Sequence, residues 1–297
     1  MPHHYRQYPR WQRTNVGNDM LRLLWIGVGA VIALGCSPPQ QNAPTSKDTD
    51  PAAASDGDTL VQFSLLAALA ADDYVGGATL REVLAGGDFG VGTFNRLDGE
   101  MIVLDGKMYQ ALADGTVRMA ELEGTTPFAA VTFFKDDGRI DNITAATLDD
   151  LDEQLDLKLP RRNSPYAVRI TGEFAELILR SVPAQSPPFR PLVEVVKQQV
   201  TWQHRNLRGT LVGLRCPHWM STLNVSGYHW HFLSNDHKIG GHVLACEFQR
   251  GSLRYDECTS VVIHIPQSTE FDEFDAGEVT DQDIDRIERQ RTQIGPP

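Results

Sequence analysis

The sequence predicts an α/β (α+β) protein of two domains: a mixed β-sheet N-terminal domain and an antiparallel, barrel-like C-terminal β domain. The 297 residues are 41% hydrophobic and 8% aromatic, which is enough for one large or two ordinary globular domains. Helix-like and strand-like segments are interspersed in the first part, and five strand-like runs then follow one another between residues 200 and 265. We therefore expect domains over residues 60–187 and 188–297.

Residues 1–35 have the features of a signal peptide. Leu23–Leu34 is uncharged and apolar, but it is shorter than the roughly 20 residues that a membrane-spanning helix needs. Arginines precede it and small residues end it, as in a secretory signal. The end, Ala-Leu-Gly-Cys36, resembles the lipobox of bacterial lipoproteins, which implies cleavage before Cys36 and lipidation of its thiol. Ordinary secretion with an unmodified Cys36 is the alternative.

Residues 36–59 are expected to be the lipidated cysteine and a disordered tether. The stretch 37–59 contains no large aliphatic or aromatic residue, so it has nothing to bury. A tether between a lipid anchor and a folded body predicts a protein held on a membrane surface outside the cytoplasm, on the periplasmic side, or else secreted.

The N-terminal domain is expected to combine helices with a β-meander. The Asp-Gly pairs at 105–106 and 114–115 separate short apolar runs between residues 92 and 120, which is typical of hairpins. Thr79 is placed to begin a helix whose apolar face includes Leu80 and Val83. The other expected elements are a helix at Gln62–Ala71, a strand at Phe128–Phe134, an acidic helix at Leu148–Leu157, and strands at Tyr166–Ile170 and Phe174–Arg180.

Prolines at 183, 187, 188 and 191 mark the domain boundary, and Pro191 can begin a short helix. The strands expected in the C-terminal domain are Val200–His204, Gly209–Leu214, Gly227–Leu233, Gly241–Phe248 and Ser260–Ile265. The acidic tail from Glu270 onward has low hydrophobicity and is expected to be solvated.

The charge balance argues against a nucleic-acid partner. The net charge is −12, and residues 1–35 hold four arginines against one aspartate, so the body is more acidic than the whole chain. An acidic body repels phosphate backbones.

The cysteines of the body, Cys216, Cys246 and Cys258, contain no Cys-x-x-Cys pair, which argues against a thiolate zinc site or a dithiol redox enzyme. Cys246 and Cys258 flank a turn signal at residues 250–252. In an oxidising compartment, a disulfide between them is a hypothesis.

The histidines point to a metal site. Seven of the nine lie between His204 and His264. In the run Tyr228-His-Trp-His-Phe232, the alternation of a strand places both histidines on one face and the three aromatic residues on the other. The aromatic residues can then be buried while His229 and His231 face a cleft.

Residues i and i+2 of a strand lie roughly 6.5–7 Å apart, so both rings can reach one ion with Zn–N bonds of about 2.0–2.1 Å. A polar loop at 233–241 returns the chain through His242, which we expect beside His231. Three neutral histidines with an open fourth position are typical of a catalytic metal site. The remaining histidines of the body are expected in ordinary loop, packing or strand positions: His204, His218, His237 and His264.

Several motifs together resemble the α-acetolactate decarboxylase family. They are the run GTFNRLDGEMIVLDGKMYQ at 92–110, RSVP at 180–183, GTLVG at 209–213, GYHWHF at 227–232 and GGHV at 240–243. The resemblance extends in the same order over nearly all of residues 60–290.

The resemblance implies a homodimeric enzyme of acetoin and 2,3-butanediol biosynthesis that converts (S)-2-acetolactate to (R)-acetoin and CO2. It implies a Zn2+ ion held by three histidines, which fall on His229, His231 and His242. The family's other functional residues fall on Thr93, Glu100, Arg180 and Glu288.

These residue types suit the reaction. Loss of CO2 from a β-keto acid leaves an enediolate, which a Lewis acid stabilises. Arg180 carries a permanent charge that can orient the carboxylate or stabilise the oxyanion. Glu100 and Glu288 are candidates for proton donor and shuttle, if burial or mutual repulsion keeps one of them protonated.

Two other functions fit the histidine cluster. A cupin-like or carbonic-anhydrase-like metal enzyme can place His-x-His and a third histidine on an antiparallel sheet, and it would need neither Arg180 nor Glu100. A lipid-anchored metal-binding protein would bind the ion without turnover.

Overall fold

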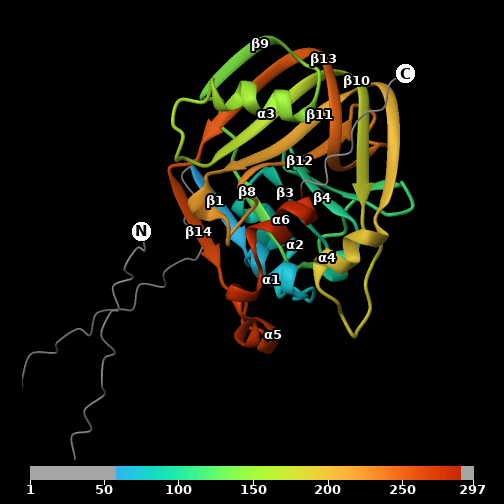
Figure 1. Cartoon of the computed structure of the whole chain (residues 1–297), viewed down its shortest axis with the longest axis vertical. Coiled ribbons are helices and arrows are strands. Elements are labelled where there is room, and N and C mark those ends of the chain that lie inside the picture. The colour runs from blue at the N-terminus through green and yellow to red at the C-terminus, as the bar shows by residue number, and fades with distance from the viewer. Residues whose placement is uncertain (1–57, 289–297) are drawn as a thin grey trace, which may run out of the picture. The chain divides into compact units, whose positions relative to one another are not determined.

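The computed structural model describes residues 58–288, apart from the side chain of Glu278. Two large β-sheets make up most of this part of the chain (Figure 1). The expected signal peptide, Cys36 and nearly all of the tether lie outside the described residues. None of the helices between residues 58 and 288 has the length and apolarity that a membrane-spanning helix needs.

The first sheet has seven strands in the order β14-β1-β8-β3-β4-β5-β6. The pairing of β1 with β14 is parallel and the others are antiparallel. The consecutive strands β3 to β6 form the expected meander. The strands are β1 (Thr59–Phe63), β3 (Phe89–Thr93), β4 (Glu100–Leu104), β5 (Lys107–Ala111), β6 (Val117–Met119), β8 (Ala129–Thr132) and β14 (Ser260–His264).

The second sheet has five antiparallel strands in the order β10-β11-β12-β13-β9, and β10 also pairs with β13. The pairings of β10, β11, β12 and β13 therefore form a ring. The barrel-like shape expected from the sequence stays a prediction. The strands are β9 (Gly138–Ala145), β10 (Tyr166–Ser181), β11 (Val200–Cys216), β12 (Gly227–Ser234) and β13 (Gly240–Glu257).

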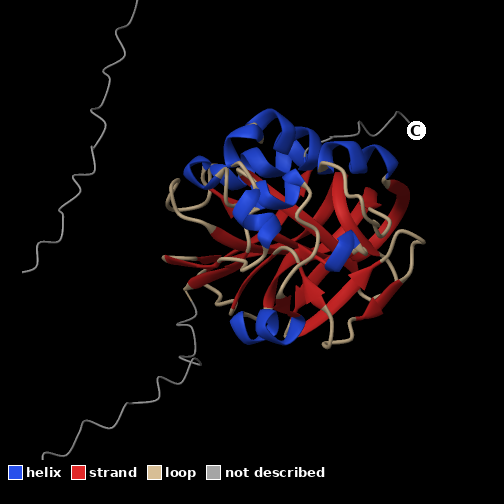
Figure 2. Cartoon of the chain, turned by 90° about the horizontal axis from the view of Figure 1, so that it is seen from below, coloured by secondary structure: helices blue, strands red, loops and turns tan. Residues whose placement is uncertain are grey.

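The helices lie on the outside of the strands, and most of them gather at one side (Figure 2). The mixed α+β class predicted from the sequence is confirmed. The helices are α1 (Leu66–Ala71), α2 (Leu80–Gly86), α3 (Leu148–Asp156), α4 (Leu192–Val195), α5 (Thr269–Glu273) and α6 (Asp281–Glu288), with 3-10 turns η1 (Asn95–Leu97), η2 (Val196–Gln198), η3 (His218–Met220) and η4 (Ala276–Glu278). Two short strands, β2 (Ala78–Thr79) and β7 (Thr125–Thr126), pair separately.

Helix α3 is attached to the back of β12 and helps to orient that strand. The indole Nε1 of Trp230 donates a hydrogen bond of 2.8 Å to Asp152, and the hydroxyl of Tyr228 donates one of 3.1 Å to Asp156. The two aromatic rings stack with centroids 5.5 Å apart. Because these residues occupy one face of β12, the histidines between them face the other way.

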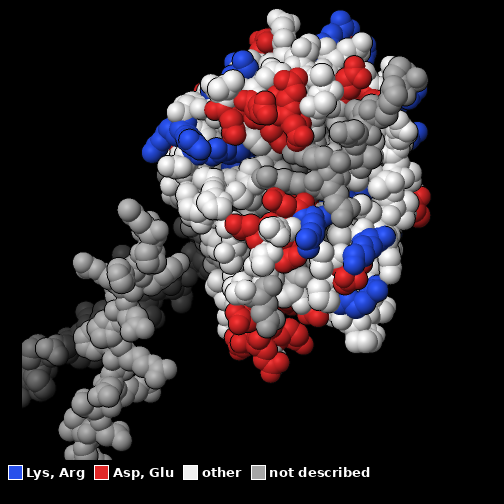
Figure 3. All heavy atoms as spheres, viewed as in Figure 1, with Lys and Arg blue, Asp and Glu red and all other residues white. Residues whose placement is uncertain are grey.

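Acidic side chains gather over α3 and α5 on the face shown in Figure 3. A groove beside α3 is lined by Asp149, Asp152, Glu153 and Asp156, together with Asp285 of α6. The acidic surface agrees with the net charge of −12.

The helix expected at Gln62–Ala71 begins later than predicted. Residues up to Phe63 belong to β1, and the helix α1 begins at Leu66. Strand β1 lies between β8 and β14 and is buried along most of its length. Pairing on both edges therefore outweighs the helix propensity of this segment.

Several strands are longer than expected. Tyr166–Ile170 and Phe174–Arg180 belong to the single strand β10, which contains bulges near Phe174, and Val200–His204 and Gly209–Leu214 both belong to β11. Gly172 of β10 pairs with Gly209 of β11 and with Gly251 of β13. The absence of side chains at these three positions lets the long strands lie close together at this point. The segments expected to separate these strands lie within continuous strands in the structure.

The hypothesis of a disulfide between Cys246 and Cys258 is wrong. The turn signal at residues 250–252 lies inside β13, which continues to Glu257. Cys246 pairs with Leu177, whereas Glu257 pairs with Tyr166 at the far end of β10. An extended strand rises about 3.3 Å per residue, so the two cysteines are much farther apart than the roughly 7 Å limit for a disulfide. The cysteines are not bonded to each other.

The structure differs from the expected division at residue 187. Strands β9 and β10 precede this residue, yet they pair with β13 and complete the second sheet. Strand β14 follows it, yet it pairs with β1 in the first sheet. The described residues belong to one compact unit. Long-range strand pairing crosses the proline-rich segment in both directions, and composition alone does not show this.

The acidic tail is not simply solvated. It forms α5, η4 and α6, and Ile284 and Ile287 of α6 are buried. These two side chains pack in one cluster with residues of α1 and α4, including Leu69 and Val195. This packing brings the end of α6 to the second sheet.

Candidate active site

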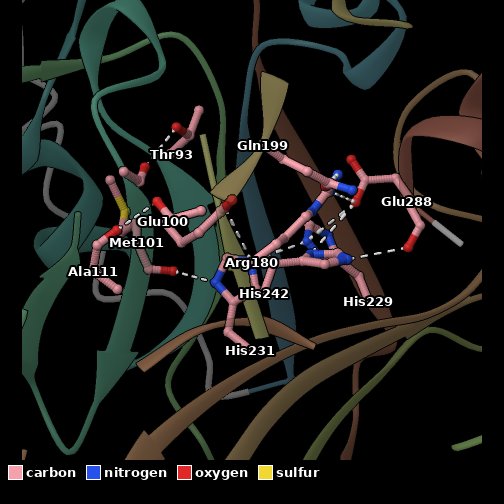
Figure 4. A network of polar contacts seen from close by, with 12 residues as sticks. Thr93, Glu100, Met101, Ala111, Arg180, Gln199, His229, His231, His242 and Glu288 are labelled. Carbon is pink, nitrogen blue, oxygen red and sulfur yellow. Dashed lines mark hydrogen bonds and ion pairs between the residues drawn. The ribbon is translucent and has the colours of Figure 1, made fainter. Parts of the chain in front are cut away.

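Strands β12 and β13 bring three histidines together. His229 and His231 point to the same side of β12, and their Nε2 atoms are 3.2 Å apart. His231 pairs with His242 of β13 in the strand register. All three are buried, and one ring nitrogen from each lies within 4.8 Å of those of the other two (Figure 4). The structure therefore places the three predicted ligands at one point.

Hydrogen bonds orient two of the rings. Nδ1 of His231 is 2.8 Å from the carbonyl oxygen of Met101, and Nε2 of His242 is 3.1 Å from the carbonyl oxygen of Glu288. A carbonyl only accepts, so these nitrogens carry the protons. The lone pairs are then on Nε2 of His231 and Nδ1 of His242, and both are available to a metal ion.

The three histidines are uncharged at neutral pH. Burial, assisted by the charge of Arg180, lowers the pKa of His229 to about 3. Burial also holds the pKa values of His231 and His242 well below the usual range. Among the described residues, Nδ1 of His242 has no hydrogen-bond partner, and the Nε2 atoms of His229 and His231 have only each other. Three neutral, buried imidazoles with nitrogens left for another partner fit a divalent metal ion such as Zn2+.

Glu288 and Arg180 lie together on one side of the histidines. One carboxylate oxygen of Glu288 is 3.6 Å from Nε2 of His229, 3.6 Å from Nδ1 of His242 and 3.3 Å from Nη2 of Arg180. Arg180 also donates to the carbonyl of Ile287 at 2.6 Å and to the side chain of Gln199 at 3.2 Å. Arg180 thus holds the end of α6 through both side chain and backbone.

Glu100 approaches the histidines at His231. Its Oε2 atom is 3.6 Å from Nε2 of His231. Burial raises the pKa of Glu100 to about 7, with Arg180 opposing the shift and Glu288 adding to it. A substantial fraction of Glu100 therefore carries a proton at neutral pH, which an exposed glutamate does not.

Thr93 lies opposite Glu100, as its partner across the β3–β4 pair. Its hydroxyl donates to the carbonyl of Gly99 at 2.9 Å, within the tight connection between the two strands. Arg96, Leu97 and Gly99 all have positive φ in this connection. Thr93 therefore supports the backbone conformation that leads into Glu100.

A cavity joins these groups and has an apolar wall. Its polar lining includes Thr93, Glu100, Arg180, His229 and Glu288, so the structure brings together the residues predicted from both halves of the chain. The wall comes from α1, α4, α6 and neighbouring segments. Its residues are Leu66, Leu69, Leu97, Phe128, Val182, Leu192, Val196 and Ile287.

Sequence reasoning did not identify the residues of this wall, nor Gln199 and the Met101 carbonyl. Apolar side chains on short helices look like ordinary core residues, and a backbone carbonyl has no signal in the sequence.

The four other histidines of the body lie away from the site, as expected. His237 and His218 are exposed, His204 lies in β11, and His264 stacks on Phe63 in the first sheet.

Comparisons with known proteins agree on one family. The family model described as Alpha-acetolactate decarboxylase matches residues 60–277. A relative named alpha-acetolactate decarboxylase from Methanosarcina mazei is 38% identical over 232 residues, which cover 78% of this chain and 81% of that protein. One of the same name from Klebsiella aerogenes is 38% identical over 212 residues, or 71% and 82% of the two chains.

Solved structures agree with the sequence matches. The crystal structure of alpha-acetolactate decarboxylase from Bacillus subtilis strain 168 superposes with a TM-score of 0.74 at 33% identity, and the match covers 78% of this chain and 99% of that one. A Staphylococcus aureus protein, described as of unknown function and similar to alpha-acetolactate decarboxylase, also has a TM-score of 0.74, at 29% identity. With the family model covering most of the chain, the protein belongs to the alpha-acetolactate decarboxylase family.

Proposed function

We propose that this decarboxylase converts (S)-2-acetolactate to (R)-acetoin and CO2 in a metal-dependent reaction. The observation that carries the proposal is the meeting of three neutral histidines, two carboxyl groups and one guanidinium at a single buried site. The substrate has a carboxylate, a hydroxyl and a keto group. The site offers partners for an anionic group and for developing charge on oxygen.

The proposed cofactor is Zn2+, held by His229, His231 and His242. Their neutral imidazoles, and the hydrogen bonds that orient His231 and His242, support this assignment. When bound, the ion supplies Lewis acidity to the keto and hydroxyl oxygens of the substrate, which favours the enediolate that remains when CO2 leaves.

Arg180 is the proposed partner of the substrate carboxylate or of the oxyanion. Its guanidinium is buried and permanently charged, and three hydrogen-bonded or ion-paired neighbours hold it in place. Its Nε has no hydrogen-bond partner within the described part of the chain, which leaves one donor for a ligand.

Glu100 is the proposed proton donor to the carbon that loses CO2, and Glu288 is the proposed second member of the proton path. The raised pKa of Glu100 keeps a proton on its carboxyl group near neutral pH. Placing one donor on one side of the substrate would account for a single product enantiomer. The apolar wall keeps bulk water away from the carbanionic intermediate.

We also propose that the enzyme acts outside the cytoplasm as a lipid-anchored homodimer. The signal-like residues 1–35 and the lipobox-like end at Cys36 support the anchor. The family resemblance supports the dimer. Radiolabelled palmitate incorporation that is lost in Cys36→Ser tests the anchor, and sedimentation equilibrium of the detergent-solubilised protein tests the dimer.

The test of the function is acetoin formation from racemic 2-acetolactate by the full-length protein. The arms are protein supplied with zinc, protein treated with a chelator, His231→Ala, and Arg180→Ala. His237→Ala is the matched control because His237 is an exposed histidine in the loop between two proposed ligands. We expect (R)-acetoin from the zinc-supplied protein and from His237→Ala. We expect loss of activity on chelation and in both other variants.

Two results would contradict the proposal. Full acetoin formation by Arg180→Ala would contradict the proposed role of Arg180. A folded protein with one zinc per chain that forms no acetoin would favour a metal-binding protein.

A further inference from the structure

We infer that a second cavity, separate from the active site, binds a small organic cation: a primary ammonium group on a short apolar chain. The cavity lies between the end of β1, the loop before β2 and the segment that follows β14. It shares no lining residue with the active-site cavity. Its acidic and aromatic residues are Asp73, Glu82, Phe63 and His264.

The central observation is the carboxylate of Asp73. Asp73 is 7% exposed and lines the cavity. Among residues 58–288, its side chain accepts no hydrogen bond and forms no salt bridge. A buried carboxylate is costly unless a cation or hydrogen-bond donors compensate it. No protein group in the described part of the chain supplies such a partner, so a cation that enters the cavity can pair with this carboxylate in place of water.

The charges around Asp73 are also acidic. Burial raises the pKa of Asp73, and the neighbouring Glu270 and Asp72 raise it further. Glu82 adds another carboxylate to the cavity lining. Its Oε2 atom accepts hydrogen bonds from the backbone and the hydroxyl of Thr79 at the start of α2. These groups together favour a cationic ligand over a neutral or anionic one.

The rest of the lining favours an organic cation over a bare metal ion. The rings of Phe63 and His264 stack with centroids 4.7 Å apart, and Val75, Pro127 and Ile265 add aliphatic surface. The cavity measures about 290 Å³, close to the lower end of the range for small-molecule sites. An ammonium group can pair with Asp73 while its alkyl chain contacts this apolar surface.

The test is a calorimetric titration of full-length protein with butylammonium chloride at pH 8. n-Butanol is the neutral analogue, and potassium and calcium chloride are the inorganic competitors. The variant is Asp73→Asn. Its matched control is Glu153→Gln, which removes an exposed carboxylate from the acidic groove beside α3.

We expect saturable one-to-one binding of butylammonium in the millimolar range, and binding at least tenfold weaker in Asp73→Asn. That factor corresponds to about 1.4 kcal/mol. Glu153→Gln should leave the affinity unchanged, and n-butanol should bind far more weakly. Equal affinity in wild type and Asp73→Asn would overturn the inference, as would equal binding of n-butanol. Displacement by millimolar potassium or calcium would also overturn it, because the site would then be an inorganic cation site.

A second measurement needs no variant, so it holds even if Asp73→Asn does not fold. Gly76 and Gly77 line the cavity, and their backbone amide resonances should shift with the bound fraction of butylammonium. Amides of the active-site strand β12 should not shift. Shifts confined to other regions of the protein would place the ligand elsewhere and refute the inference.

Discussion

Burial controls the charge of each group at the active site, and it acts in opposite directions on acids and bases. It lowers the pKa values of the three histidines and raises that of Glu100, because in each case it disfavours the charged form. One physical cause therefore keeps the histidines neutral, as the proposed metal site requires, and keeps Glu100 protonated, as its proposed role requires.

Replacing Glu100 tests its proposed role as a proton donor. We expect Glu100→Gln to lower kcat by about 10²–10⁴-fold, because the amide fills the same space but has no acidic proton. Zinc content should stay at the wild-type level, since the change leaves His229, His231 and His242 in place. Steady-state kinetics and metal analysis of the same preparation make the measurement. Glu153→Gln serves as control, and an unchanged kcat in Glu100→Gln would rule out this role.

At the scale of single elements, packing on the back face of β12 fixes the direction of its two histidines. The ring of Trp230 lies directly against Gly213 of the neighbouring strand β11. A Cβ atom at Gly213 would lie 2.1 Å from a ring carbon of Trp230. Glycine therefore leaves the space that lets Trp230 stay flat on the sheet, with His229 and His231 on the opposite face.

We expect Gly213→Ala to lower the free energy of unfolding by about 1–3 kcal/mol, because the added methyl group overpacks the site. Zinc affinity should fall as well, since a shift of Trp230 moves the two histidines beside it. Chemical denaturation and competition with a chromophoric chelator measure the two effects. Gly77→Ala is the control, because its Cβ would meet no atom within 4 Å. Equal stability of the two variants would show that Trp230 moves without cost.

Local sequence patterns predicted which segments form helices and which form strands. They often did not predict the residues at which these elements begin and end. Helix α3 and the hairpins of the first sheet appear where apolar spacing and Asp-Gly turns predict them. Strands β10, β11 and β13 run through glycines and a turn-like triplet, because pairing on both edges supplies hydrogen bonds that local sequence does not reveal.

At the scale of the whole molecule, each sheet contains strands from both sides of the proline-rich segment, and helix α6 contacts the active site. The end of β13 lies near the start of β1, where the amides of Thr259 and Ser260 donate to the carbonyl of Asp58. Asp256 is fully buried at this junction, and one of its oxygens accepts from the backbone of Lys135 at 3.1 Å. Its other oxygen has no hydrogen-bond partner among residues 58–288.

Asp256 should make stability depend on pH. The pKa of Asp256 is raised to about 7, mainly by burial. The hydrogen bond from the backbone of Lys135 partly opposes this shift, and the negative charges of Asp137 and Asp58 add to it. The unfolded chain releases this proton near pH 4, about the usual value for aspartate, whereas the folded chain keeps it to about pH 7. The free energy of unfolding should therefore fall as the pH rises through this window.

We expect Asp256→Asn to be more stable than wild type above pH 7 and to lose this advantage towards pH 4. Urea denaturation between pH 4 and pH 8 measures the difference between the two proteins. The exposed Asp141 provides the control Asp141→Asn, which should follow the wild-type pH dependence. A constant difference between Asp256→Asn and wild type across this range would show that Asp256 titrates normally.

The alternation of His229 and His231 with aromatic residues, and the return of the chain through His242, were readable from the sequence because strand geometry is local. The family motifs placed Thr93, Glu100, Arg180 and Glu288 in the same site. Residue patterns could not show the apolar wall, the strand exchange between sheets, or the approach of α6 that carries Glu288 to Arg180. These depend on contacts between residues more than 100 positions apart, and the free energy of such contacts comes from burial in the assembled fold rather than from any local preference.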